Sequence, residues 1–156
     1  MLALSMLLPR SAALVVALGA AFLATSPAGA AEFRSVGVAV AILYDGPSAQ
    51  ARRLWLAPRG TPFEVLASTP PWVRVRDASG DVAWIDRGDL AAQRTVVARG
   101  QASVRSAGQE GAEVLFVVER GVGLELLDPA AISGWLRVRH RGGASGWIRA
   151  ADIWGV

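Results

Sequence analysis

Few side chains in this sequence could carry out catalysis. His140 is the only histidine, and the chain has no cysteine. The neighbours of His140 are Arg139 and Arg141, so no adjacent carboxylate orients its ring as the aspartate of a serine–histidine–aspartate triad would. No nucleophile-elbow motif is present, and no histidine or cysteine cluster has the spacing of metal ligands. The sequence therefore predicts no catalytic residue, no cofactor and no metal site.

Paired carboxylates are the remaining route to hydrolytic chemistry. Asp86 lies near Asp89 in the sequence, and Glu110 lies near Glu113. Two carboxyl groups held about 5 to 10 Å apart can cleave a glycosidic bond, one as the acid and the other as base or nucleophile. Acidic residues at such spacing more often solvate loops. We therefore interpret these pairs as surface groups and expect a protein that is not an enzyme.

Tryptophan beside arginine is the pattern that favours binding. Trp72 precedes Arg74, and the same spacing recurs at Trp135 and Arg137. A partly exposed tryptophan next to an arginine is typical of ligand-binding surfaces, where these two residue types contribute much of the binding energy. The alternative interpretation is that each tryptophan covers the open end of its domain or packs under a long loop.

These residues belong to a repeat that spans most of the chain. The segment WVRVRDASGDVAWIDRGDL, residues 72–90, recurs as WLRVRHRGGASGWIRAADI, residues 135–153. Upstream of it, residues 54–66 resemble residues 115–127 in the same way. Self-similarity of this kind indicates two copies of one structural unit.

Each copy is predicted to be an all-β domain. Short runs rich in β-branched and aromatic residues, among them residues 35–43, are separated by glycine, proline, aspartate and serine. No stretch beyond residue 30 sustains a helical period over three turns. Short strands in a unit of about 60 residues fit a small closed β-barrel, which removes exposed strand edges. We predict two such domains, residues 31–92 and 93–156, and the short connection at residues 91–93 should restrict their mutual orientation.

The repeated segment is predicted to form a β-hairpin with its turn at residues 77–80. In this register Val73 is opposite Trp84, and cross-strand partners share one side of a sheet. Trp84, and Trp147 in the second copy, should then point into the core, where a large ring buries much apolar area. The first tryptophan of each hairpin should begin the opposite, more exposed face.

The first thirty residues resemble an export signal. Arg10 precedes an apolar run at residues 11–24, and small residues follow at 28–30. The run is shorter than the roughly 20 residues that a spanning helix needs, so we expect cleavage after Ala30 or one residue later, with an uncleaved anchor as the less favoured alternative. Without cysteine, no lipid can be attached there and no disulfide can form. We expect a periplasmic or secreted protein with no membrane span after cleavage.

The arginine content does not indicate nucleic-acid binding. The chain has 16 basic residues, all arginine, and 13 acidic residues, which leaves a formal net charge of +3. The high isoelectric point follows from the absence of lysine, since arginine stays protonated over a wide pH range. An export signal would also take the chain away from nucleic acid. We therefore predict no nucleic-acid partner and keep nucleic-acid binding only as the least favoured alternative function.

The repeat resembles the bacterial SH3 (Src-homology-3-like) domain family. The shared pattern consists of W-(V/L)-R-V-R, a glycine turn, (A/G)-W-I and a closing D-(L/I). The second copy matches it better, because residues 102–106 resemble a common family segment and Gly146 precedes Trp147 as in the family's Gly-Trp pair. The first copy departs from the family at residues 41–48 and at Ala83. The resemblance implies two consecutive SH3-like barrels.

The resemblance also implies a function. Family members resemble non-catalytic modules that bind wall peptides, glycan strands or protein segments, often in a groove beside the first long loop. It therefore implies a cell-envelope module that recognises peptidoglycan peptide or glycan, or an envelope protein. The alternative is an accessory or inhibitory subunit that docks on an envelope enzyme. The proline and tyrosine of the eukaryotic polyproline groove are missing after Ile85, so no polyproline binding is predicted. The candidate ligand-binding residues are Tyr44, Asp45, Trp72, Arg74, Arg105, Trp135 and Arg137.

Overall fold

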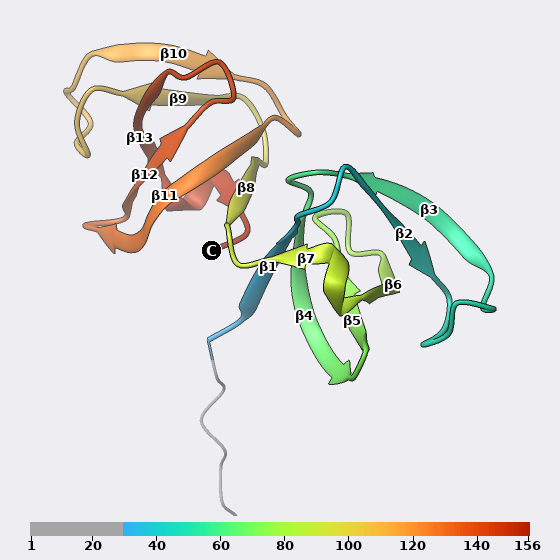
Figure 1. Ribbon diagram of the computed structural model, residues 1–156. Coiled ribbons are helices and arrows are strands. Elements are labelled where there is room, and N and C mark those ends of the chain that lie inside the picture. Colours follow the sequence, from blue (N-terminus) through green and yellow to red (C-terminus); the bar gives the residue numbers. More distant parts are fainter. Residues whose placement is uncertain (1–29) are drawn as a thin grey trace, which may run out of the picture.

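The structure, a computed structural model, describes residues 30–156, which form two β-barrels in sequence order (Figure 1). The predicted export signal lies outside the described residues, apart from Ala30. The described part of the chain contains strands and two short 3-10 helices but no α-helix, which confirms the all-β prediction. None of its helices is long and apolar enough to cross a membrane.

Barrel one is built from seven strands and one 3-10 helix. In chain order these are β1 (Glu32–Val36), β2 (Val40–Tyr44), β3 (Arg53–Pro58), β4 (Pro62–Thr69), β5 (Trp72–Arg76), β6 (Val82–Asp86), η1 (Arg87–Asp89) and β7 (Leu90–Ala91). The strand order in the sheet is β3-β2-β6-β5-β4-β1-β7. Because β7 pairs with β1, the last strand of the barrel lies beside its first strand.

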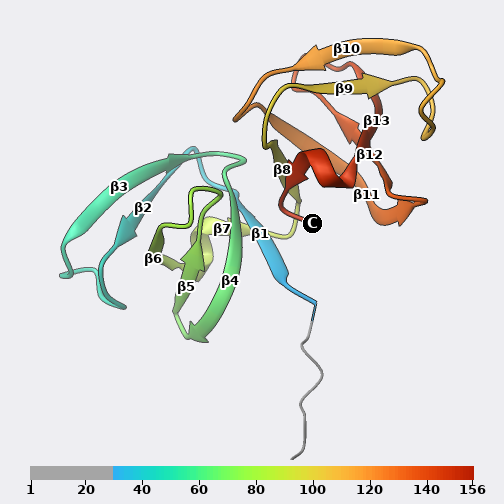
Figure 2. The same ribbon diagram turned by 180° about the vertical axis from the view of Figure 1, so that it is seen from behind.

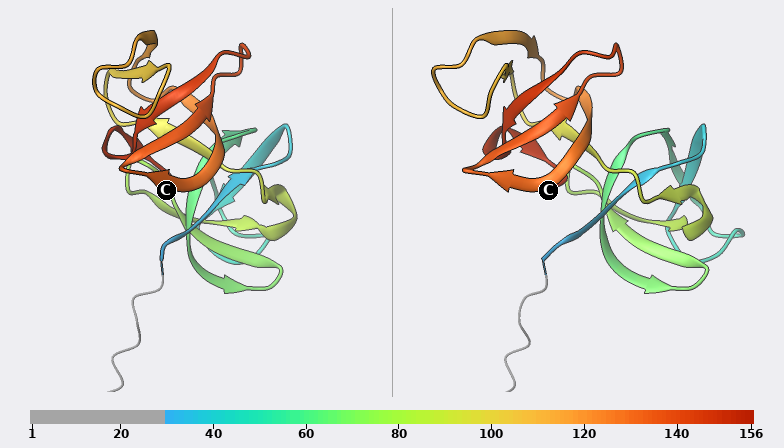
Figure 3. Two further views of the ribbon diagram at one scale, coloured as in Figure 1. Left: turned by 90° about the vertical axis from the view of Figure 1, so that its left-hand side faces the viewer. Right: turned by 60° about the vertical axis from the view of Figure 1, so that its left-hand side comes forward.

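Barrel two repeats this arrangement. Its elements are β8 (Thr95–Ala98), β9 (Ala102–Arg105), β10 (Val114–Val118), β11 (Gly123–Ile132), β12 (Trp135–Arg139), β13 (Ser145–Arg149), η2 (Ala150–Asp152) and β14 (Ile153–Trp154). The strand order is β10-β9-β13-β12-β11-β8-β14, the same topology as in barrel one. Figures 2 and 3 show the two curled sheets side by side, each around its own interior.

Each barrel has a separate apolar core. The strands alternate between buried and exposed positions, as the period of two in a half-buried sheet requires. The core of barrel one is formed by Val36, Ala41, Leu43, Ala57, Phe63, Val73, Val75, Ala83 and Ile85. The core of barrel two is formed by Val96, Ala98, Ala102, Val104, Val118, Leu124, Leu126, Leu136, Val138, Ile148 and Ile153. Two cores of this kind confirm that the repeat encodes two structural units.

The segment predicted as one strand at residues 35–43 is divided. β1 ends at Val36 and β2 begins at Val40, with Gly37 after the end of β1. A Cβ on Gly37 would lie 2.8 Å from the Cβ of Ala91, so only glycine allows β7 to approach this closely. The division lets the chain leave β1 and enter β2 on the other side of the barrel.

The hairpin register differs by one residue from the prediction. Val73 is opposite Ile85 and Arg74 is opposite Trp84, because the loop contains five residues, 77–81, rather than four. The Asp77 carboxylate stabilises this longer loop, since its Oδ1 accepts hydrogen bonds from the backbone N–H groups of residues 79 and 81 at 2.8 and 3.0 Å. The prediction that Trp84 belongs to the core is therefore wrong, and Ile85 occupies that place.

The same correction applies to barrel two. Ile148 is fully buried opposite Leu136, whereas Trp147 is opposite Arg137 and half-buried on the outer side of the sheet. Leu136 and Val138 on the paired strand are buried with it. Ile148 rather than Trp147 thus contributes the core side chain of this strand.

Specific contacts join the two barrels. The buried Ser35 hydroxyl of barrel one accepts a hydrogen bond from the backbone N–H of Thr95 at 2.9 Å. The ring of Phe33 packs edge to face against Trp154 with centroids 5.1 Å apart, and the Arg94 guanidinium lies 5.7 Å from the Phe33 ring centroid. Burial lowers the pKa of Arg94 from its ordinary value. These contacts restrict the orientation of the barrels, as their short connection predicts.

Candidate functional site

The outer side of β5 and β6 in barrel one carries a cluster of aromatic rings. The register places Arg74 opposite Trp84 and Trp72 opposite Asp86, so these side chains share one side of the sheet. Tyr44 on β2 pairs with Trp84 on β6. The Tyr44 and Trp72 rings are 5.3 Å apart between centroids and nearly perpendicular, which is a favourable aromatic geometry. Tyr44, Trp72 and Trp84 together are called the aromatic surface, and all three are half-buried.

Charged groups of both signs surround the aromatic surface. Arg74 is exposed, and its guanidinium has no hydrogen bond or ion pair within residues 30–156. Asp45 follows Tyr44, and its carboxylate bonds both the backbone N–H of Arg52 at 3.0 Å and the Arg52 Nε at 3.1 Å. Asp45 therefore closes the loop between β2 and β3 at one side of the surface.

Asp86 and Asp89 lie together at the end of β6. The Asp86 Oδ1 accepts a hydrogen bond from the Gly88 N–H at 2.7 Å and so caps η1. Burial, and to a lesser extent the charge of Asp86, raises the pKa of the Asp89 carboxyl from its ordinary value. One carboxylate of this pair, that of Asp86, thus stabilises a turn of the backbone.

The equivalent surface of barrel two is covered. Trp135 lies on the outer side of its sheet but is only 7% exposed, because the loop between β9 and β10 lies over it. A Cβ on Gly108 in this loop would be 3.0 Å from the Cβ of Trp135 and 3.3 Å from Cε3 of Trp147. The expectation of an exposed ring at Trp135 is wrong, and the alternative that it packs under the long loop is confirmed.

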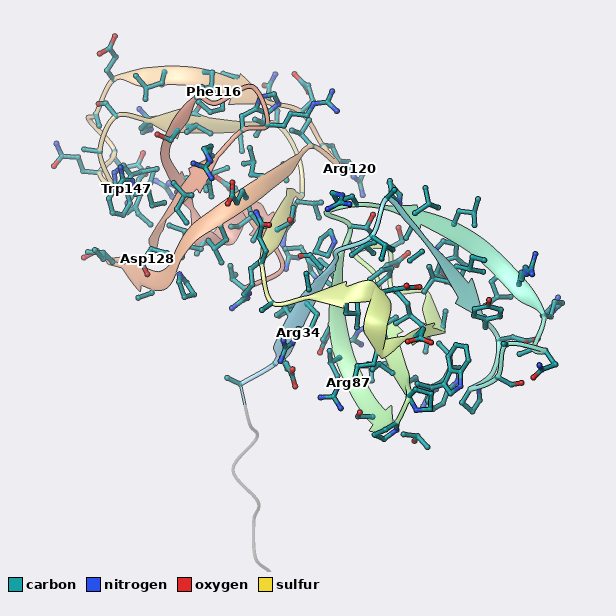
Figure 4. The ribbon with its side chains drawn as sticks, viewed as in Figure 1. Arg34, Arg87, Phe116, Arg120, Asp128 and Trp147 are labelled. Carbon is teal, nitrogen blue, oxygen red and sulfur yellow. The ribbon has the colours of Figure 1, made fainter. Side chains whose placement is uncertain are left out.

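Arginines hold this covering loop. Arg105, at the repeat position of Tyr44, donates from Nη1 to the backbone oxygen of Ala112 at 2.8 Å. Arg149, at the repeat position of Asp86, forms an ion pair with Glu110 of the loop, and its guanidinium lies 5.6 Å from the Trp135 ring centroid. Figure 4 shows Trp147 at the end of barrel two that lies away from barrel one. Arg137 stays exposed on this face.

The structure thus separates the seven predicted site residues into two groups. Tyr44, Asp45, Trp72 and Arg74 come together on barrel one, whereas Arg105, Trp135 and Arg137 belong to the covered face of barrel two. Sequence reasoning missed Trp84 because of the shifted register. The signal that could have revealed it is Asp77, whose carboxylate accepts a hydrogen bond from the backbone N–H of residue 81 and so stabilises a turn one residue longer.

The other chemically interesting side chains have local roles. His140 Nδ1 accepts a hydrogen bond from the Gly142 N–H at 3.2 Å, and its ring lies 6.2 Å from that of Phe116. Among residues 30–156, no group of three or more histidine and acidic side chains is placed to hold a metal ion.

The chain was compared with known families and structures. The bacterial SH3 domain family matches it twice, at residues 37–91 and 98–155. Similar solved structures include NlpC2 from Trichomonas vaginalis, with 16% identity over 80% of this chain and 48% of that one at a TM-score of 0.37. NlpC1 from the same organism has 17% identity over 83% and 48%, and an NlpC/P60 family protein from Bacillus cereus ATCC 10987 has 16% over 79% and 56%, both at a TM-score of 0.37. The chain spans about half the length of these structures, and no curated protein matches it.

Proposed function

Because the chain belongs to the bacterial SH3 domain family, with one domain in each barrel, we propose that it is an exported, non-catalytic module of the cell envelope whose barrel one binds peptidoglycan peptide. The observation that carries this proposal is the aromatic surface, Tyr44, Trp72 and Trp84, which keeps three rings partly open to solvent. Exposed rings on a rigid sheet bind ligands at little entropic cost, because their side chains are already ordered.

The charges around the aromatic surface suit a peptide that carries both amines and carboxylates. The guanidinium of Arg74, which has no partner among residues 30–156, can donate two parallel hydrogen bonds to a carboxylate. Asp86 lies across from Trp72 and offers a carboxylate to an amine, which the ring face of the tryptophan also attracts. Wall peptides carry both kinds of group, whereas a neutral glycan strand would use only the rings.

Barrel two has a different role in this proposal. The loop between β9 and β10 packs against Trp135 and occupies the position that the proposed ligand would take on barrel one. In this proposal barrel two does not bind the wall peptide. It fixes the orientation of barrel one through the contacts between the barrels. The proposal of a non-catalytic module is supported by the local structural roles of His140 and Asp86.

The test is retention of the purified protein by isolated peptidoglycan sacculi. We expect the wild type to be retained, and Trp72→Ala and Trp84→Ala to weaken binding at least about tenfold, which corresponds to about 1.4 kcal/mol. Trp147→Ala, at the repeat position of Trp84, is the matched control and should bind like the wild type. Thermal unfolding of each variant shows that it is folded.

Two results would contradict the proposal. One is a wild-type protein that sacculi do not retain. The other is an equal loss of binding in Trp84→Ala and Trp147→Ala. Stoichiometric co-purification of one envelope enzyme without retention by sacculi would favour the docking subunit instead.

A further inference from the structure

A cleft of about 820 Å³ lies between the two barrels, apart from the aromatic surface. Barrel one lines it with the turn between β3 and β4, residues 58–62, and barrel two lines it with the equivalent turn between β10 and β11, residues 121–123. The hairpin of β12 and β13 closes another side with residues 139–141 and 143. Figure 4 shows Arg120, which lies between β10 and β11, on the side of barrel two that faces barrel one. The two copies of the repeat thus turn the same loop toward each other.

The contacts between the barrels give the cleft a defined shape. The hydrogen bond from the Thr95 N–H to the Ser35 hydroxyl lies beside the cleft, because Thr95 is one of its lining residues. The Arg94 guanidinium donates to the backbone oxygen of Gly155 at 2.6 Å and fixes the chain where it passes from one barrel to the other. A preformed cleft in the size range of about 300 to 1,000 Å³ is typical of ligand sites.

The charge in the cleft is unbalanced. Three arginines line it, Arg59, Arg139 and Arg141, against the single carboxylate of Glu125. Glu125 is already engaged, since it accepts two hydrogen bonds from Arg139 at 2.7 and 2.9 Å and one from the Gln93 amide at 2.9 Å. Within the described part of the chain, Arg59 and Arg141 have no ion pair and no side-chain hydrogen bond. Among the residues that the structure describes, the cleft therefore holds two guanidinium groups without a partner, one from each barrel.

Free guanidinium groups on facing walls of a cleft favour a ligand with more than one acidic group. Guanidinium binds carboxylate or phosphate in a planar, two-fold hydrogen-bonded geometry. The rest of the lining includes apolar side chains, Pro58, Pro62, Val97 and Val122, which favour a ligand with hydrocarbon between its charges. An acidic peptide has both features, whereas inorganic phosphate has only the charge. We propose that the cleft between the barrels binds an acidic peptide segment, with Arg59 and Arg141 as the groups that bind its carboxylates.

Fluorescence anisotropy with a labelled peptide tests this site. The probe is Glu-Val-Glu-Val-Glu-Val, and its neutral counterpart Gln-Val-Gln-Val-Gln-Val is the control peptide. We expect the acidic peptide to bind the wild type, and Arg59→Gln and Arg141→Gln each to raise Kd about fivefold, the loss of about 1 kcal/mol from one exposed charged contact. The double variant should bind at least about tenfold more weakly.

Matched controls separate this site from general attraction and from the aromatic surface. Arg87→Gln removes the same charge from an exposed arginine that Figure 4 shows on barrel one, away from the cleft, and it should leave Kd within about twofold. Trp84→Ala should not change binding of the acidic peptide. The cleft proposal can therefore fail while the proposed function stands, and the proposed function can fail while the cleft proposal stands.

Three results would overturn the proposal. The acidic peptide does not bind measurably, the neutral peptide binds equally well, or Arg87→Gln weakens binding as much as Arg59→Gln does. Inorganic pyrophosphate is the competitor. Displacement of the peptide only at much higher pyrophosphate concentration supports a peptide ligand, whereas tighter binding of pyrophosphate would assign the cleft to phosphate instead.

Discussion

Replacing Ile85 and Trp84 one at a time by alanine tests which of these neighbours fills the core of barrel one. Ile85 has 0% exposure and lies opposite Val73 inside the barrel, whereas Trp84 is half-buried on the outer side of the same strand. Truncating a buried isoleucine to alanine costs about 2 to 5 kcal/mol, through lost burial and the cavity that remains. Ile85 packs among the other buried side chains of barrel one, so we expect about 3 kcal/mol for Ile85→Ala.

This free energy converts into a measurable shift in Tm. For a domain of the size of barrel one, about 1 kcal/mol lowers Tm by about 4 to 8 °C, so Ile85→Ala should lower it by about 15 °C. Trp84→Ala loses contacts on one face only and should cost about 1 to 2 kcal/mol, which gives about one third to two thirds of that shift. Far-ultraviolet circular dichroism during heating measures both. A larger loss for Trp84→Ala than for Ile85→Ala would refute the register and the outward position of the tryptophan.

Two further predictions concern the contact between the barrels and the half-buried carboxylate of Asp89. Ser35→Ala should cost about 1 to 3 kcal/mol and speed hydrogen exchange of the Thr95 amide, because that N–H loses its acceptor; unchanged exchange would argue against the contact. Asp89→Asn should raise Tm at neutral pH. Because burial raises the pKa of Asp89, the folded state binds its proton more tightly than the unfolded chain, and stability falls as pH rises from the ordinary pKa through the raised one. The gain in Tm from the asparagine should disappear below about pH 3, where Asp89 is protonated in both the folded and the unfolded chain. Melting curves at neutral pH and below about pH 3 measure this difference, and a gain that persists at the low pH would contradict the prediction.

The architecture could be predicted from the sequence because the sequence contains two copies of the same structural unit. The repeat of residues 72–90 at 135–153 indicates two units, and the alternation of Val73 and Val75 with arginines indicates half-buried strands. These patterns are local, because each can be recognised within a single strand. They are therefore sufficient to predict two all-β domains of one family.

The face of each tryptophan could not be predicted in the same way. A single extra loop residue exchanges the two sides of a strand, and here the Asp77 carboxylate stabilises the longer loop. The burial of Trp135 depends on a loop that comes close at Gly108, a contact between segments distant in the sequence. The cleft between the barrels depends in turn on the contacts of Ser35 and Phe33 with barrel two.

One measurement tests the central claim most directly: the shifts of the tryptophan indole N–H signals in nuclear magnetic resonance spectra during titration with a soluble peptidoglycan peptide. The chain has 6 tryptophans, and each gives one such signal. We predict that the signals of Trp72 and Trp84 move with the added peptide, while those of Trp135 and Trp154 stay in place. Spectra in which no signal moves, or in which only the tryptophans of barrel two respond, would contradict the proposal that the aromatic surface of barrel one binds the cell-wall peptide.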